Sequence, residues 1–305
     1  MYEPLIVLVG PTAVGKTSLS LPVAEALKAE IVNVDSRQLY RYMDIGTAKP
    51  TPEQQARVPH HLLDLLLPHQ KTDAAQFVTV ARQTIDQLLQ RGRRVVVVAG
   101  SGLYLQALLY SLMPTPASSE ALRQELYTYA DDYGPYALHR RLQAIDPEAA
   151  RVYHPHDRVR VVRAIEVTYL TGEPFSVHCR RHRHDRPYYP YVGFALTRER
   201  ADLYARIAAR TEDMLASGWL AEVKTLVAKG YTHHCAAMNS LGYRELLQYI
   251  AGQESWTETV AAIKRKTRRF AKRQLTWFRK FPAVCWYDLS VQRETEVVTQ
   301  LLRSL

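Results

Sequence analysis

Cysteine is scarce in this sequence, and long apolar runs are missing. Only three of the 305 residues are cysteines (Cys179, Cys235 and Cys285). They lie far apart and are odd in number, which excludes a disulfide framework and a zinc-ligand spacing. No segment approaches the roughly 18 apolar residues of a membrane span. A strand-like segment lies close to the N-terminus, so we expect no cleaved signal peptide. Together these features predict a protein of the reducing cytoplasm, without a membrane segment.

Acidic residues are outnumbered, and one segment has none. The chain carries 40 Lys and Arg against 30 Asp and Glu, a net charge of +10. Residues 259–282 contain nine Lys or Arg and no acid, interleaved with aromatic residues. Such a segment suits a nucleic-acid backbone with stacked bases. It also fits an amphipathic helix with a solvated basic face and with Phe270, Leu275 and Phe278 in the core. The segment alone does not decide between the two.

The apolar segment 5–9 runs directly into a glycine-rich loop. This loop, Gly10-Pro11-Thr12-Ala13-Val14-Gly15-Lys16-Thr17, fits the pattern G-x-x-x-x-G-K-[ST], and a helical pattern follows it. In such a P-loop the backbone N–H groups surround a phosphate, the lysine adds a positive charge and the threonine hydroxyl faces Mg²⁺. The sequence therefore predicts a site for a diphosphate or polyphosphate.

The rest of the chain predicts an α/β protein with a helical insertion. Strands are expected at 5–9, 30–34, 94–99, 190–196 and 283–287, and helices at 16–28, 74–91, 103–112 and 200–215. A proline-containing break at 113–116 is followed by a segment with helical patterns only. We expect a P-loop NTPase-like parallel sheet flanked by helices, formed by residues 1–112 and 190–305. Residues 113–189 are expected to form an all-helical insertion.

An acidic residue follows the second expected strand and not the third. The third strand ends in Gly100-Ser101-Gly102, whereas the second ends in Asp35. Ligands of open α/β sheets bind beyond the carboxyl ends of the strands, so Asp35 and the P-loop are expected to share one crevice. A carboxylate placed there suits a proton acceptor for an incoming nucleophile. The alternatives are a Mg²⁺-shell residue and a helix cap.

Residues 178–184, rich in His and Arg, form the one compositionally biased stretch. Metal binding is conceivable for such a stretch, but its flanks suggest no cage of ligands. We expect a flexible cationic loop.

Residues 35–50, DSRQLYRYMDIGTAKP, closely resemble a signature of the tRNA dimethylallyltransferases, also called tRNA isopentenyltransferases. The resemblance continues in order through further blocks: 60–64 (HHLLD), 100–105 (GSGLYL), 154–167 (HPHD to EV), 240–245 (SLGYRE) and 272–279 (KRQLTWFR). With the P-loop, these blocks extend over nearly the whole chain. Ser101 stands where the family usually has threonine, which keeps a hydroxyl.

The resemblance implies transfer of a dimethylallyl group from dimethylallyl diphosphate to N6 of the adenosine on the 3′ side of the tRNA anticodon. It implies that residues 10–17 hold the donor's diphosphate, with Thr17 near Mg²⁺ and with Arg200 helping. Asp35 would take the N6 proton. It also implies a bacterial-type enzyme, without the zinc-finger extension of eukaryotic relatives. We expect a monomer.

The resemblance further assigns tRNA contacts, for the anticodon stem-loop, in both parts of the chain. The positions are Asp35, Ser36, Arg37, Gln38, Ser101, Arg123, Val159, Arg160, Val161, Val162, Arg163, Asn239, Ser240, Leu241, Gly242, Tyr243 and Arg244. For Arg163 an internal ion pair with Glu166, one helical turn on, is the competing interpretation.

Other functions account for part of the pattern. A P-loop kinase of small metabolites or nucleosides would explain the loop and Asp35, but not the net charge of +10. An adenylate isopentenyltransferase would use the same donor on a free nucleotide, and the tRNA-type blocks argue against it. An RNA-binding GTP or ATP switch would need an acidic residue after the third expected strand and, for guanine, an N-K-x-D motif, and the sequence has neither.

Overall fold

The computed structural model describes residues 3–110, 112–182, 186–281 and 283–305, and its strands form one parallel sheet. The strands within the described residues are β1 (Leu5–Val9), β2 (Glu30–Val34), β3 (His60–His61), β4 (Val95–Ala99), β5 (Tyr191–Thr197) and β6 (Val284–Asp288). Their order is β3-β2-β4-β1-β5-β6, and every neighbouring pair is parallel. β4 therefore lies between the first two strands of the chain.

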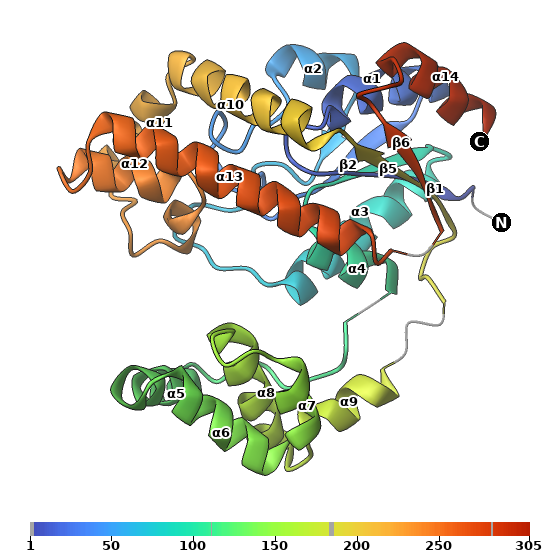
Figure 1. Cartoon of the computed structure of the whole chain (residues 1–305). Helices are drawn as coiled ribbons and strands as arrows, with labels where there is room; N and C mark the ends of the chain where they lie inside the picture. Colours follow the sequence, from blue (N-terminus) through green and yellow to red (C-terminus); the bar gives the residue numbers. More distant parts are fainter. Residues whose placement is uncertain (1–2, 111, 183–185, 282) are drawn as a thin grey trace. The chain divides into compact units, whose positions relative to one another are not determined.

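Helices cover both faces of this sheet (Figure 1). The helices of the same compact unit are α1 (Lys16–Leu27), α2 (Pro52–Arg57), α3 (Ala74–Gln90), α4 (Gly102–Tyr110), α10 (Arg200–Ala216), α11 (Trp219–Ala228), the 3₁₀ turn η1 (Ala236–Asn239), α12 (Tyr243–Ile250), α13 (Trp256–Phe278) and α14 (Glu294–Arg303). Figure 1 shows α1 and α14 on one face and α3 and α4 on the other. Side chains of a strand alternate between the two faces, which explains why the central strands β1 and β4 are apolar throughout.

Two apolar clusters stabilise this unit. Ile6, Leu8 and Phe194 from the strands pack against α1, α10 and α14. A second cluster forms around Trp219 and Tyr243, both at most 2% exposed, and joins α11 and α12 to the segment that follows β2. Burial of that much apolar surface is the main stabilising contribution in a domain of this size.

A second compact unit extends from Tyr110 to Arg186 and consists of helices. These are α5 (Glu120–Tyr133), α6 (Pro135–Ile145), α7 (Pro147–Val152), α8 (Arg158–Thr171) and α9 (Phe175–Arg181). It has its own core, in which Leu126, Leu138 and Ile165 are fully buried. Asp146 caps α7 by accepting a hydrogen bond from the Ala149 N–H at 3.0 Å.

The sequence predictions agree with these elements except in short segments. The five expected strands and four expected helices are present with ends shifted by one or two residues. The sequence analysis missed β3 and α2, which are only two and six residues long. The prediction of a loop at 178–184 is wrong for His178–Arg181, which form the last part of α9; residues 183–185 lie outside the described residues. In the described part of the chain, no helix has the length and apolar character needed to cross a bilayer.

Candidate active site

The carboxyl ends of β1, β4 and β2 place three loops side by side. Val9, Ala99 and Val34 are in register on these neighbouring strands. The chain therefore leaves the sheet at adjacent points into the P-loop, the Gly100–Gly102 loop and the segment that begins with Asp35. The expected common crevice follows from this strand order.

The P-loop is anchored by its apolar residue and by its lysine. Gly15 precedes α1 with φ 115°, a backbone conformation that favours glycine. Val14 is fully buried in the apolar cluster beside the sheet, so its side chain anchors the loop to the core. The Lys16 ammonium donates to the carbonyl oxygens of Gly10 at 2.8 Å and Pro11 at 3.0 Å. Thr17 is exposed in the first turn of the helix.

The electrostatics of Lys16 connect the P-loop to Asp35 and Arg210. The pKa of Lys16 is lowered to about 8, chiefly by burial and then by the Arg210 guanidinium, whereas the Asp35 carboxylate acts in the raising direction. Burial also lowers the pKa of Arg210, and Asp35 again opposes this. Three ionisable groups from α1, α10 and the end of β2 thus lie within electrostatic range of one another. Two cations and one carboxylate leave the site positively charged and ready for an anion.

Hydrogen bonds from two loops orient the segment after β2. The Arg37 N–H donates to Asp35 Oδ1 at 2.8 Å. The Ser36 N–H donates to Ser101 Oγ at 3.0 Å, so the serine in the GSGLYL block holds the chain immediately after Asp35. Asp35 Oδ2 points toward Gly100, where a Cβ atom would lie 2.5 Å from it. The hydroxyl expected at position 101 therefore contacts protein backbone in this structure.

Arg210, and not the arginine that the sequence analysis chose, is among the charges that shift the pKa of Lys16. Arg200 is exposed at the start of α10, with its guanidinium 5.4 Å from the centre of the Tyr204 ring. By contrast, Arg206 Nε donates to the Ala13 carbonyl at 3.0 Å. Arg206 and Arg210 are four residues apart and so share a face of the helix. That spacing was the available signal for Arg210.

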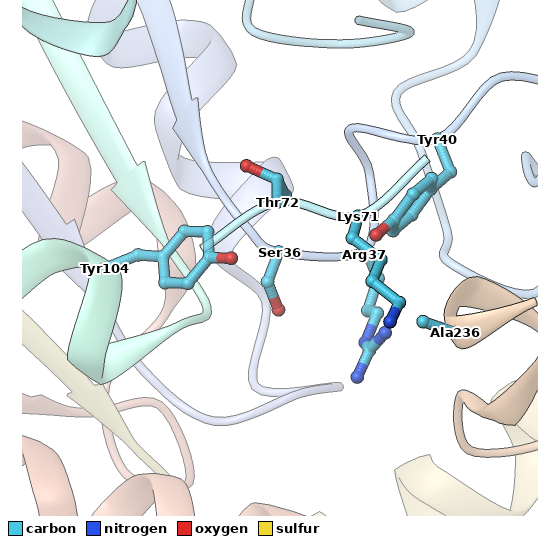
Figure 2. Close-up of a pocket in the computed structure, with 7 residues that line it drawn as sticks. All are labelled: Ser36, Arg37, Tyr40, Lys71, Thr72, Tyr104 and Ala236. Atoms are coloured by element: carbon cyan, nitrogen blue, oxygen red, sulfur yellow. The ribbon is translucent and has the colours of Figure 1, made fainter. Parts of the chain in front are cut away.

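A pocket of about 400 Å³ opens beside the Asp35 segment. It is lined by Ser36, Arg37, Tyr40, Lys71, Thr72, Tyr104 and Ala236. Figure 2 shows Ser36 between Tyr104 and Arg37, with Arg37 and Lys71 extending toward the same side. Burial raises the pKa of Tyr104 to about 12, so its phenol stays neutral at physiological pH. The pocket thus offers aromatic rings and two cations, a combination that suits a nucleotide.

The other positions expected to contact tRNA in this unit divide by exposure. Gln38 is occupied internally, because its Nε2 donates to the Ala48 carbonyl at 3.0 Å. Tyr243 is fully buried and donates its hydroxyl proton to Glu222 at 2.6 Å. Ser240 and Gly242 are buried as well, and Leu241 is half-buried. Asn239 and Arg244 remain exposed at the surface. Block 239–244 therefore serves the fold through most of its side chains.

In the helical unit, Glu166 is fully buried between two of the arginines expected to contact tRNA. Arg123 donates to both of its oxygens at 2.9 Å, and Arg163 pairs with Oε2. Burial acts to raise the pKa of Glu166, but these hydrogen bonds outweigh it and the pKa is lowered. The internal ion pair of Arg163 is therefore present, and Arg163 also donates to the Pro116 carbonyl at 3.0 Å.

The block 159–163 on α8 has one buried and one exposed face. Val161 and Val162 are at most 1% exposed and belong to the helical core, so the prediction that they contact tRNA is not supported for their side chains. Val159 and Arg160 lie at the surface, where Arg160 forms a 3.3 Å ion pair with Asp157. The helical period places only some residues of this block at the surface, and only those side chains can contact a ligand.

The long helix α13 (orange-red in Figure 1) presents most of its cations to solvent. Lys264 pairs with Glu212, and Lys266 pairs with the buried Glu245 at 2.7 Å. The exposed cations of the segment are Arg265, Arg268, Arg269, Lys272, Arg273, Arg279 and Lys280. Phe270, expected in the core, is 37% exposed, and the Arg273 guanidinium lies 5.9 Å from its ring centre.

Comparison with known proteins identifies the family. The sequence profile of the IPP transferases matches residues 38–281 of this chain. The chain belongs to the IPP transferase family. Among its relatives in this family, the tRNA dimethylallyltransferase of Symbiobacterium thermophilum is 47% identical over 309 residues, covering 99% of this chain and 96% of the relative. That of Geobacter sulfurreducens is 45% identical over 284 residues, covering 93% and 91%.

Solved IPP transferase structures have the same fold. The tRNA isopentenylpyrophosphate transferase of Bacillus halodurans superimposes with a TM-score of 0.73 at 38% identity, covering 99% of this chain and 95% of that one. A eukaryotic dimethylallyltransferase acting on tRNA gives a TM-score of 0.80 at 25% identity, covering 99% and 80%. The parallel sheet and the helical segment described above thus belong to the fold of the IPP transferases.

Proposed function

We propose that this protein transfers a dimethylallyl group from dimethylallyl diphosphate to N6 of the adenosine 3′-adjacent to the anticodon in tRNA, with release of diphosphate. The observation that carries the proposal is that Lys16, which follows β1, and Asp35, which follows β2, lie within electrostatic range of each other and of Arg210 on α10. An anion site and a carboxylate side by side are what a diphosphate leaving group and a nucleophilic amine require.

The donor's diphosphate is proposed to bind at the P-loop. Backbone N–H groups at the start of α1, the Lys16 ammonium and the Arg210 guanidinium would stabilise the charge that develops as the bond from C1 to oxygen breaks. Arg210 fits this role better than Arg200 does, because Arg210 shifts the pKa of Lys16, whereas the exposed Arg200 guanidinium lies 5.4 Å from the centre of the Tyr204 ring. The exposed Thr17 hydroxyl is a hard oxygen donor of the kind Mg²⁺ prefers. Bound there, Mg²⁺ would supply further charge neutralisation on the departing diphosphate.

Asp35 is proposed as the proton acceptor. The N6 lone pair of adenine is delocalised into the ring, so the amine must be held against C1 of the donor. The new N6–C1 bond forms as the C1–O bond breaks, the diphosphate keeps the bonding electrons, and the N6 proton passes to Asp35. The Arg37 N–H and the Ser101 loop hold Asp35 in place for this step. The base must leave the loop's stack to reach it.

The partner is proposed to be the anticodon stem-loop of tRNA, bound by a monomer in the cytoplasm. Exposed cations on α13 and the exposed Arg160 on α8 support phosphate contacts, and the pocket of Figure 2 supports contact with unstacked nucleotides. The relatives are named for acting on tRNA, which favours this reaction over a kinase or an adenylate isopentenyltransferase.

Mass analysis of nucleosides tests the reaction directly. Unmodified tRNA is incubated with the protein, Mg²⁺ and dimethylallyl diphosphate, then digested. The proposal predicts an adenosine heavier by one dimethylallyl group, found only in the anticodon loop. Parallel reactions contain free AMP, or ATP in place of the prenyl donor. Prenylated AMP would favour the free-nucleotide enzyme, and ADP formation without prenyl transfer would favour a kinase.

A further inference from the structure

Gln274, on the inner side of α13, is a buried polar residue that the reaction above does not use. It is 6% exposed and lies in the KRQLTWFR block. Its side-chain oxygen accepts a hydrogen bond from the Thr12 N–H at 2.9 Å. Its Nε2 donates to the Gly100 carbonyl at 2.7 Å. One amide thus connects the P-loop to the loop that follows β4.

The two hydrogen bonds require the two different ends of an amide. The Thr12 backbone offers a donor and the Gly100 backbone offers an acceptor, so the connecting group must accept on one side and donate on the other. Two side chains of similar length show why. An ionised glutamate could accept the hydrogen bond from the Thr12 N–H but could not donate to the Gly100 carbonyl, and a methionine would leave both of these backbone groups without a partner. Unpaired buried backbone groups are rare because they lose their hydrogen bonds to water.

The connected loops carry both halves of the proposed chemistry. Thr12 lies in the loop proposed to hold the diphosphate. Gly100 lies against Asp35, since a Cβ atom there would be 2.5 Å from Asp35 Oδ2 and 3.8 Å from Gln274 Nε2. The next residue, Ser101, holds the Ser36 N–H at 3.0 Å. The Gln274 amide therefore links the loop proposed to hold the donor to the loop that lies against the Asp35 carboxylate.

A neighbouring side chain fixes the same loop a second time. Trp277, one turn along α13, packs so closely on Gly102 that a Cβ atom at Gly102 would lie 2.2 Å from its ring. α13 thus holds the Gly100–Gly102 loop at two points and the P-loop at one. The helix that presents the exposed cations is also the helix that positions the reacting groups.

We propose that Gln274 is a positioning residue that sets the separation between the diphosphate site and Asp35. This inference rests on the proposed function. Gln274 touches neither substrate in the proposal and acts through the backbones of Thr12 and Gly100. A shift of about 1 Å between reacting groups is enough to slow a positioned reaction by about 10²-fold.

The test uses Gln274→Met, Gln274→Glu and, as the matched control, Thr276→Ala, which alters an exposed residue on the same helix. Single-turnover transfer is measured at saturating dimethylallyl diphosphate and anticodon stem-loop RNA. Binding of Mg²⁺-pyrophosphate is measured by calorimetry. For Gln274→Met we expect transfer to fall by about 10- to 100-fold and pyrophosphate affinity by up to about 10-fold. The control should stay within about twofold of the parent, as is usual for exposed substitutions.

The pH response of Gln274→Glu separates positioning from mere stabilisation. A protonated carboxyl has one donor and one acceptor, as the amide does, whereas the ionised form cannot donate to Gly100. The transfer rate of this variant, divided by the parent rate at the same pH, should therefore fall as the pH rises from 5.5 to 8. The same ratio for Gln274→Met should be low and independent of pH.

Two results would overturn the proposal. One is transfer and pyrophosphate binding by Gln274→Met within twofold of the control, even with a lower melting temperature. The other, which also decides the matter if Gln274→Met does not fold, is a ratio for Gln274→Glu that does not change with pH. If the parent protein transfers no prenyl group, the proposed function fails, but pyrophosphate binding by the variants still tests whether Gln274 holds the P-loop.

Discussion

Donor binding should weaken as the pH rises above 8, because Lys16 must be protonated to hold the diphosphate. The pKa of Lys16 is lowered to about 8 in the unliganded protein, first by burial and then by Arg210. A bound diphosphate favours the charged ammonium and raises this pKa again. Binding at alkaline pH is therefore coupled to uptake of a proton.

The size of the effect follows from the fraction of protein with charged Lys16. With a pKa of about 8, that fraction is ~0.9 at pH 7 and ~0.1 at pH 9. The apparent dissociation constant is the intrinsic one divided by the competent fraction, so it should rise about tenfold over this range. Unliganded stability should move in the opposite direction. The unfolded chain keeps its lysine proton up to about pH 10.5, so between about pH 8 and 10.5 it binds more protons than the fold. This one group therefore makes the unliganded fold more stable as the pH rises through that window.

Calorimetric titration with dimethylallyl diphosphate and Mg²⁺ at pH 7, 8 and 9 measures the effect. Repeating the pH 8 titration in buffers of different ionisation enthalpy gives the number of protons taken up, expected at about one half. Lys16→Arg is the control, because arginine keeps its charge throughout and retains only the ligand's own titration. Equal pH responses in the parent and in Lys16→Arg would refute the role assigned to Lys16.

Four further predictions address the acceptor, the metal, the RNA and the buried Glu166. Asp35→Asn should lower the single-turnover rate by about 10²–10⁴-fold with RNA affinity unchanged, and a rate within a few-fold of the parent would rule out Asp35 as the base. Thr17→Ala should raise the Mg²⁺ concentration needed for half-maximal transfer, and EDTA should stop the parent reaction; an unchanged Mg²⁺ titration would exclude a metal contact at this hydroxyl. Arg160→Ala should reduce the slope of log affinity against log salt by about one without changing stability, as expected for one lost phosphate contact. Arg163→Ala should instead lower the free energy of unfolding by about 1–3 kcal/mol, because Glu166 is buried and loses a partner. Equal melting temperatures for the two arginine variants would contradict this division.

The local sequence was sufficient to predict the P-loop, the main strands and the family. Gly15 adopts a positive φ directly before α1, and the lysine and threonine that follow begin the helix, so the motif is determined within eight consecutive residues. The central strands β1 and β4 are apolar on both faces because helices cover both sides of a parallel sheet. Such patterns are set by residues close together in the sequence, so they can be recognised without knowledge of the tertiary structure. β3 escaped prediction because two residues cannot show a period.

Exposure within the tRNA-type blocks could not be predicted from their motifs. Val161 and Tyr243 belong to blocks assigned to RNA, yet each is fully buried in a separate apolar cluster. Arg163 satisfies a buried carboxylate, whereas Arg160, three residues earlier, is exposed. A motif records which residue types occur together, but only packing decides which of them face solvent.

The active site itself depends on contacts between distant parts of the chain. β4 enters the sheet between β1 and β2 and so places Gly100 between the P-loop and Asp35. Arg210 and Gln274 reach this site from α10 and α13, far along the chain, and no local pattern specifies their targets. The sequence alone determined that Lys16 and Asp35, the groups proposed to bind a diphosphate and to accept a proton, follow the first two strands of the chain. The tertiary structure decided which arginine and which amide stand beside them, because those choices depend on strand order and helix packing.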